Sequence, residues 1–197
     1  LTGFSAIDGK FNEAVGGSDE GVMLEVLYKG TFSYAATADL TSEGIKRAAK
    51  RALAAAQAAQ PYGIYQFDQT VRPAAQVRYA TKRETLSGIP AAETVELLCS
   101  ICDTAKVSSQ IIQTSASCET GIIETEILST NGADIRQTVR FGGISMNAVA
   151  RKGDIIQQRS ANGHAALTYQ GGRELFNAAV LLEKARKAGS EAIELLT

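Results

Sequence analysis

The chain has 197 residues, of which 20 are basic and 21 acidic, and its formal net charge is −1. This balance gives no general attraction to nucleic acid or to acidic membranes, so direct nucleic-acid binding is not expected. No apolar run approaches the roughly 18 residues of a membrane-spanning helix, and the first residues carry no secretory signal. Three cysteines without a dense spacing pattern suit a reducing compartment. We expect a cytoplasmic protein with no membrane-bound part.

The segment from Gly21 to Gln60 predicts a β-hairpin followed by a helix. Residues 22–28 alternate between apolar and mixed positions, Lys29-Gly30 provides a tight turn, and residues 31–36 return antiparallel. Thr41 is placed as a helix N-cap, and Pro61 ends the helix. The apolar stripe of this helix is predicted from its spacing as Ile45, Ala49, Ala52, Leu53, Ala56 and Ala59.

The other face of that helix is basic. It carries Lys46, Arg47, Lys50 and Arg51, which we interpret as a solvated helix face rather than a nucleic-acid surface.

Residues 61–90 predict a long connection with at most a short extended piece. Pro90 suits the first position of a second helix over 91–106, whose predicted apolar stripe is Val95, Leu98, Ile101, Cys102 and Ala105.

After residue 107 the period changes from helical to alternating, which predicts a meander of strands. The expected strands are 109–119, 122–129, 135–150 and 155–161. Asn131-Gly132 is a strong hairpin signal, Lys152-Gly153-Asp154 forms another turn, and Gly142-Gly143 indicates a bulge or bend. A last helix is expected over 174–196, with Gly189 as an irregularity. The fold class is therefore α+β: one domain over 1–197, with an N-terminal hairpin and helix and an antiparallel meander covered by helices.

The chain is poor in residues for catalysis. His164 is its only histidine, which excludes a two-histidine metal site built from this chain alone. It is interpreted as structural or surface-exposed, with ligand or base as the alternative. Cys99 and Cys102 have the CxxC spacing of zinc or redox sites, but they fall late in a predicted helix, which favours core packing. Cys118, on a strand, is interpreted in the same way.

Two glycine-rich segments are weak candidates for anion binding. Gly171-Gly172-Arg173 could hold an anion at a helix N-terminus or simply permit a sharp corner. The segment 16–21 resembles a phosphate loop only superficially, because neither a preceding strand nor a GK[ST] ending is evident, so a flexible turn is expected. No catalytic, cofactor-binding or metal-binding residue is assigned in this chain.

Several short motifs taken together resemble the N-terminal domain of the TldD/PmbA family, long labelled modulators of DNA gyrase and understood as metallopeptidases. The motifs of the first half are Gly9-Lys10, Glu20-Gly21-Val22, Tyr28 to Ala35 and Asp39-Leu40-Thr41. Those of the second half are Ser115-Ala116-Ser117, Ser129 to Gly132, Ala148 to Gly153, Gly171 to Phe176 and Ala192 to Leu196. The resemblance covers essentially the whole chain, with Tyr34 as a departure from the opening pattern.

The resemblance implies a cytoplasmic zinc metallopeptidase that acts on peptides or unfolded proteins. It also implies a homo- or heterodimer with a paralogous subunit. The family's zinc-binding HExxxH helix and distant cysteine lie in a C-terminal domain, so zinc is expected there and this chain is expected to be an N-terminal fragment. The residues 171–176 resemble the TldD branch more closely than the PmbA branch. An edge strand over 122–129, with Glu124 and Glu126, could hold an extended peptide.

Two alternatives remain open at this point. The chain could belong to a non-catalytic PmbA-type partner subunit or be a protein-interaction module whose sheet pairs with other chains. It could also be a CxxC redox or zinc protein, which depends on the accessibility of Cys99 and Cys102.

Overall fold

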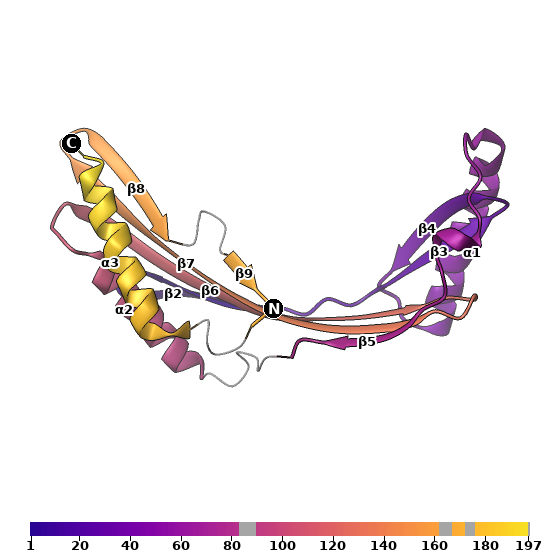
Figure 1. The fold of residues 1–197 in the computed structure, drawn as a ribbon, viewed down its shortest axis with the longest axis horizontal. Coiled ribbons are helices and arrows are strands. Elements are labelled where there is room, and N and C mark those ends of the chain that lie inside the picture. Colours follow the sequence, from indigo (N-terminus) through magenta and orange to yellow (C-terminus); the bar gives the residue numbers. More distant parts are fainter. Residues whose placement is uncertain (83–89, 162–166, 172–175, 197) are drawn as a thin grey trace. The chain divides into compact units, whose positions relative to one another are not determined.

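The computed structural model describes residues 1–82, 90–161, 167–171 and 176–196, and the chain divides into two compact units (Figure 1). The first unit comprises residues 1–17, 78–125 and 136–197, and the second comprises 18–77 and 126–135. The expectation of one domain did not include this division. The α+β class is confirmed. Among the described helices, none has the length and apolar character needed to cross a membrane.

Most of the first unit is an antiparallel sheet, to which the described residues contribute seven strands. The strands are β1 (Thr2–Ile7), β2 (Lys10–Gly16), β5 (Gln76–Ala80), β6 (Ile111–Leu128), β7 (Asp134–Lys152), β8 (Ile155–Ala161) and β9 (Leu167–Tyr169). Their order is β2-β1-β6-β7-β5, and β8 and β9 also pair with β7. The two longest strands, β6 and β7, have residues in both units.

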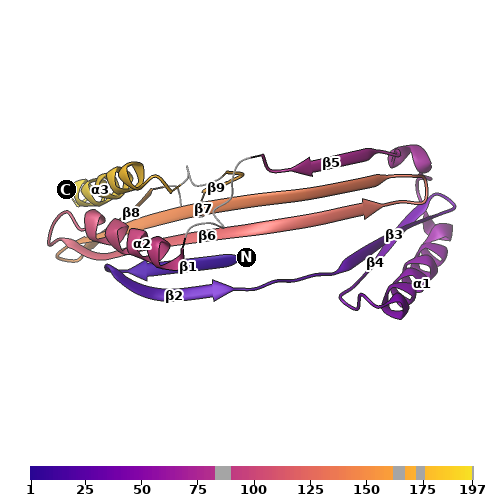
Figure 2. The ribbon, with the colours of Figure 1, turned by 90° about the horizontal axis from the view of Figure 1, so that it is seen from below.

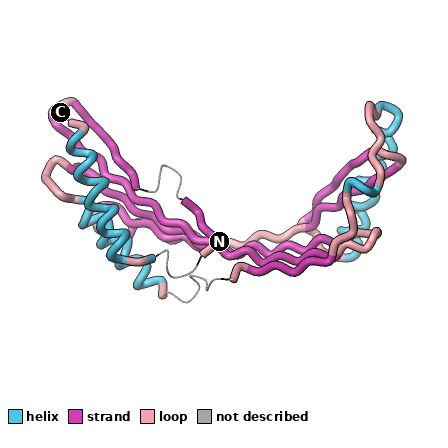
Figure 3. The backbone as a smooth tube through the Cα atoms, viewed as in Figure 1, coloured by secondary structure: helices cyan, strands magenta, loops and turns pink. Residues whose placement is uncertain are grey.

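Two helices, α2 (Ala91–Ala105) and α3 (Ala178–Glu194), lie side by side and pack on this sheet (Figure 3). The helices contribute Leu98, Ile101, Cys102, Ala105, Leu181, Ala185 and Ala192 to the core. The strands contribute Ala6, Ile111, Ala116, Cys118, Ile144, Met146, Ala148 and Ala150. The predicted stripe of α2 is confirmed at Leu98, Ile101, Cys102 and Ala105, whereas Val95 is only half-buried and Thr94 is buried instead. Apolar burial on one sheet face therefore stabilises the unit.

The second unit contains the predicted hairpin and helix. β3 (Val22–Tyr28) pairs antiparallel with β4 (Thr31–Thr37), and Lys29 and Gly30 both have positive φ, as a two-residue hairpin turn requires. α1 (Ser42–Ala59) packs on this hairpin. The connection after it holds two short 3₁₀ turns, η1 (Gln60–Tyr62) and η2 (Gln69–Val71), before β5, which agrees with the predicted long connection.

The apolar stripe of α1 was predicted partly wrong. The buried residues are Gly44, Ala48, Ala52 and Ala56, whereas Leu53 is 39% exposed. A Cβ at Gly44 would collide with Asp39, so the loop before the helix lies directly against its first turn. The helix therefore faces the hairpin with its smallest residues, because they allow close approach of the two backbones.

The hairpin of β1 and β2 was not predicted. Its turn is Asp8-Gly9, and both residues have positive φ, so the Asp-Gly signal for a two-residue turn was present. The flanking residues obscured it, because β2 is exposed along its whole length and has no apolar alternation. β2 also places a strand before the segment 16–21, contrary to the sequence analysis. The element that follows is the strand β3 rather than a helix, so a phosphate-binding loop is not formed.

Predicted strands 109–119 and 122–129 are instead one strand, β6. Gly121 does not break it, because the ring of Phe141 occupies the space where a side chain at this position would lie. β7 is one long strand through Gly142-Gly143, as predicted, and β9 pairs with it there. Gly121 therefore makes room for a neighbouring ring rather than marking a break.

The helix boundaries differ slightly from the prediction. Pro90 is the N-cap of α2 rather than its first residue, and α3 begins after its N-cap Asn177, whose side chain accepts a hydrogen bond from Val180 N. The predicted start at residue 174 lies outside the described residues. α3 is continuous through Gly189, so the predicted irregularity is wrong. A Cβ at this glycine would collide with the carbonyl oxygen of Ala105, which indicates close packing against the end of α2.

Candidate functional site

The first unit contains a cavity of about 450 Å³ between the start of β1, the start of α2 and the middle of β6. Apolar side chains form much of its wall: Leu1, Phe4, Ile122, Phe141 and Phe176. Its polar lining side chains are Thr2, Thr94, Cys118, Thr120 and Arg140. A cavity of this size, with an apolar wall and few polar groups, has the character of a small-molecule site.

Arg140 is the one charged side chain among the described lining residues. Its Nε is buried and has no hydrogen-bond partner. Within the described ranges, no carboxylate forms an ion pair with this guanidinium. Its backbone is held in place, because its amide donates to Thr81 Oγ1 at 2.9 Å. The strand therefore fixes a cation in the cavity wall, and no described carboxylate serves as its counter-ion.

The first turn of α2 also reaches the cavity. Ala91 lines it, and the N-cap Pro90 provides no side-chain cap for the first N–H groups of the helix. These groups lack intrahelical acceptors, and the helix dipole makes this end positive. Two of the three hydroxyls of the wall already donate within the chain, Thr94 to Pro90 O at 3.4 Å and Thr120 to Thr2 O at 3.4 Å, and Thr2 carries the third. The cavity thus combines an apolar wall with net positive electrostatics.

The three cysteines lie in the packed core or against it. All three are free thiols, and Cys102 and Cys118 are buried, while Cys99 is half-buried. Burial raises the pKa of Cys102, and it raises the pKa of Cys118 to about 12. Cys102 Sγ donates to Ala6 O at 3.6 Å, which is a core contact. No group of three or more His, Cys, Asp or Glu residues that could hold a metal ion occurs in the described parts of the chain.

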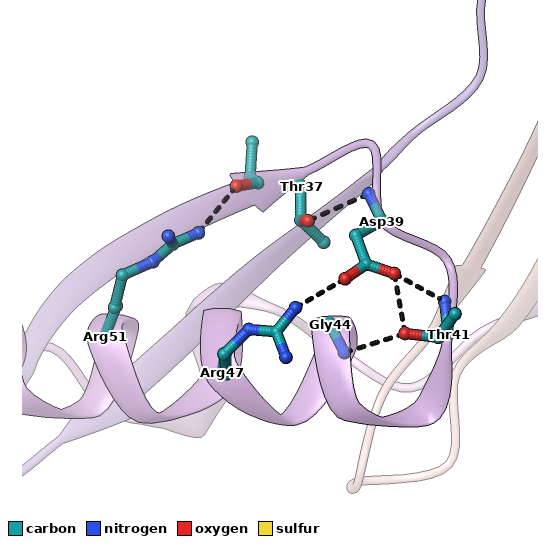
Figure 4. A network of polar contacts seen from close by, with 7 residues as sticks. Thr37, Asp39, Thr41, Gly44, Arg47 and Arg51 are labelled. Carbon is teal, nitrogen blue, oxygen red and sulfur yellow. Dashed lines mark hydrogen bonds and ion pairs between the residues drawn. The ribbon is translucent and has the colours of Figure 1, made fainter.

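The basic face of α1 forms local contacts of its own unit (Figure 4). Arg47 pairs with Asp39 at 2.5 Å, and Arg51 donates to the carbonyl of Ala36 at 3.0 Å. Asp39 also accepts from the hydroxyl of Thr41, whose side chain caps the helix by accepting from Gly44 N. Hydrogen bonds from Thr41, followed by the charge of Arg47, lower the pKa of Asp39. Arg47 remains 63% exposed, so these contacts agree with the interpretation of this side as a solvated helix face.

The remaining sequence candidates lie mostly outside the described residues. His164 does, as do Gly172 and Arg173 of the proposed anion cradle. Gly171 is described, is buried and lines the cavity. Sequence reasoning missed Arg140 and the cavity, because the lining residues are distant in sequence and only Gly171 and Phe176 among them belong to a motif recognised in the sequence.

One edge of β6 is paired along only part of its length. β1 pairs with it from Ser115 to Thr120, and Figure 2 shows β1 beginning partway along the longer strand. From Gly121 to Leu128 no other described strand lies against this edge. Ile122 and Ile123 there are 49% and 53% exposed. This part corresponds to the predicted edge strand.

Two family descriptions match the chain in succession. Residues 2–56 match PmbA/TldA metallopeptidase domain 1, and residues 84–196 match the PmbA/TldA metallopeptidase central domain. No curated protein matches.

Solved structures resemble the chain over nearly its full length. A candidate modulator of a DNA gyrase from Thermotoga maritima has a TM-score of 0.71 and 16% identity, covering 98% of this chain and 41% of that one. A candidate modulator of DNA gyrase from Bacteroides thetaiotaomicron has a TM-score of 0.71 and 14% identity, covering 98% of this chain and 42% of that one. TldE from Thermococcus kodakarensis has a TM-score of 0.55 and 12% identity, covering 96% of this chain and 41% of that one. These likenesses show a shared fold, and the chain spans about two fifths of each structure.

Proposed function

Because the chain belongs to the PmbA/TldD metallopeptidase family, we propose that it forms the part of a peptidase that shapes substrate access and subunit assembly. The observation that carries this proposal is the succession of two family domains over residues 2–56 and 84–196. The fold likeness over 98% of the chain supports it. The parent protein is proposed to act in the cytoplasm on peptides or unfolded proteins, as a dimer with itself or with a paralogous subunit.

Zinc would be bound by another part of the parent protein. The described residues do not fit a zinc site, since no three candidate ligands come together and the two buried thiols have raised pKa values. A structural or catalytic zinc ion needs three or four protein ligands, with any thiol deprotonated. The proposed place for this ion is a C-terminal domain with an HExxxH helix, as the family resemblance implies.

The free part of the β6 edge is a proposed contact for an extended peptide. From Gly121 to Thr125 its backbone groups can pair with an added strand, and the exposed Ile122 and Ile123 offer apolar contacts. Successive backbone amides in a strand point to opposite edges. Of the two variants Glu124→Pro and Thr125→Pro, one therefore removes an amide from the free edge and the other removes an amide directed at β7.

The strand-addition proposal is tested with both proline variants in the parent protein. The variant that removes an amide from the free edge should raise KM for peptide hydrolysis while the protein remains folded. The variant that removes an amide directed at β7 should lower the free energy of unfolding. Unchanged peptide capture in both variants would contradict strand addition while leaving the family role intact.

The wider proposal is tested by sequencing the gene beyond codon 197 and measuring the metal content and peptidase activity of its full product. We expect an HExxxH motif, about one zinc per chain and hydrolysis of unfolded substrates that a chelator abolishes. The isolated 1–197 chain is the control and should be inactive. A longer product with neither motif nor metal would identify a PmbA-type partner, and a zinc-loaded product without hydrolytic activity would contradict the peptidase role.

A further inference from the structure

We propose that the cavity of the first unit binds a carboxylate carried on an apolar body, with the guanidinium of Arg140 as the partner of the carboxylate. The proposal concerns this chain by itself and does not depend on peptidase activity elsewhere in a parent protein.

The orphaned guanidinium nitrogen is the main observation. A buried donor without an acceptor is destabilising, and nearly all buried polar groups in proteins have a partner. Arg140 Nε has none, although the strand holds this residue firmly through its amide bond to Thr81. Nε itself is closed to solvent, but Arg140 lines the cavity, so a carboxylate bound there would supply the counter-charge that no described carboxylate provides and would gain a charge-assisted hydrogen bond.

The rest of the cavity determines the sign of the ligand charge. The described lining residues include no carboxylate, and the uncapped start of α2 at Ala91 adds positive potential. The one other ionisable lining side chain, Cys118, stays a neutral thiol at physiological pH because burial raises its pKa to about 12. An anion is therefore stabilised here, and a cation is not.

The lining also favours a carboxylate over a phosphate. A single guanidinium matches the two oxygens of one carboxylate, and the hydroxyls of Thr94 and Thr120 already donate elsewhere. A phosphate would leave most of its charge and its acceptors unpaired in this wall. The aromatic residues Phe4 and Phe176 instead suit an apolar group attached to the carboxylate.

Two matched pairs of probes test the proposal by calorimetry on the full chain. The first pair is N-acetyl-Leu-Phe and its C-terminal amide, and the second is 4-phenylbutyrate and 4-phenylbutanamide. In at least one pair, the acid should bind about tenfold or more tightly than the amide, because a hydrogen bond to a charged group is lost in the amide. A preference in the first pair alone indicates a peptide C-terminus, and one in the second indicates a free carboxylic acid.

The variant Arg140→Gln should remove the preference for the acid. Arg151→Gln is the matched control, because Arg151 lies on the same strand, is exposed and contacts Gly153 O instead of the cavity. If Arg140→Gln does not fold, methyl NMR of the unmodified chain locates the site. The acid should shift the Ile122 methyl signals but not those of Ile155, which is equally exposed at 49% on β8. Equal binding of acid and amide in both pairs, no binding of any probe, or shifts that spare Ile122 would overturn the proposal.

Discussion

The ring of Phe141 on β7 lies where a side chain at Gly121 of β6 would have to be. Glycine in a strand interior ordinarily weakens the strand, and a cross-strand aromatic ring can compensate by covering the exposed backbone. This pair explains why β6 continues through a residue that the sequence analysis treated as a break. It also places both residues in the wall of the cavity.

The variant Gly121→Val should destabilise the first unit by about 1–3 kcal/mol, because the added side chain displaces the Phe141 ring. Denaturant unfolding measures the loss. Adding Phe141→Ala should make the cost of Gly121→Val smaller, since the two residues then no longer compete for space. Gly17→Ala is the control, because nothing lies within 4 Å of a Cβ at that position. If Gly121→Val lowered the free energy of unfolding equally with Phe141 present and with Phe141→Ala, the contact between residues 121 and 141 would be contradicted.

The variant Gly189→Ala distinguishes a packing glycine from a helix irregularity. In an unconstrained helix this change stabilises by roughly 1 kcal/mol. Here the new Cβ meets the backbone carbonyl of Ala105, which cannot rotate away, so we expect a net loss of about 1–3 kcal/mol in the free energy of unfolding. Ser190→Ala, at an exposed neighbour, is the control. A gain in stability from Gly189→Ala would refute the close approach of α2 and α3.

The contribution of Asp39 to stability should depend on pH. Its pKa is lowered below the ordinary 3.8, first by hydrogen bonds from Thr41 and then by Arg47. A carboxyl group whose pKa is lower in the folded state stabilises the protein above the unfolded pKa. This stabilisation is lost as pH falls below 3.8 through the folded value.

The measurement for Asp39 is the stability difference between the unmodified chain and Asp39→Asn across this pH range. The difference should be present at neutral pH and disappear in acid. Glu43→Gln, which removes the exposed partner of Lys46 on the same helix, is the control and should show a smaller dependence. A difference that persists in acid would show that the charge of Asp39 is not involved.

Thiol labelling tests the core assignment of the cysteines. In the native chain at neutral pH, iodoacetamide should modify Cys99 first, because Cys102 and Cys118 are buried and their raised pKa values keep them protonated. Mass spectrometry after timed quenching gives the rates, and the denatured chain should label at all three positions. Rapid native labelling of Cys102 would reopen the redox or zinc interpretation.

Local patterns in the sequence determined the elements whose signals are contiguous. The turn at Lys29-Gly30, the cap at Thr41 and four of the five stripe residues of α2 were predicted correctly, because each depends on neighbouring residues or on one helical period. The family resemblance, carried by many short motifs, was confirmed by the two family matches. The meander was recognised as a class of structure, although its strand boundaries were not.

Only the tertiary structure decided what depends on residues far apart in the chain. Gly121 and Gly189 look like breaks in sequence, but their roles come from Phe141 and Ala105 on other elements. The exposed strand β2 has no apolar alternation, so only its pairing with β1 defines it. The cavity joins β1, α2, β6 and β7, and Arg140 stands out because it lacks an acceptor there. Packing and unsatisfied hydrogen bonds are properties of the folded chain, and no local pattern in the sequence encodes them.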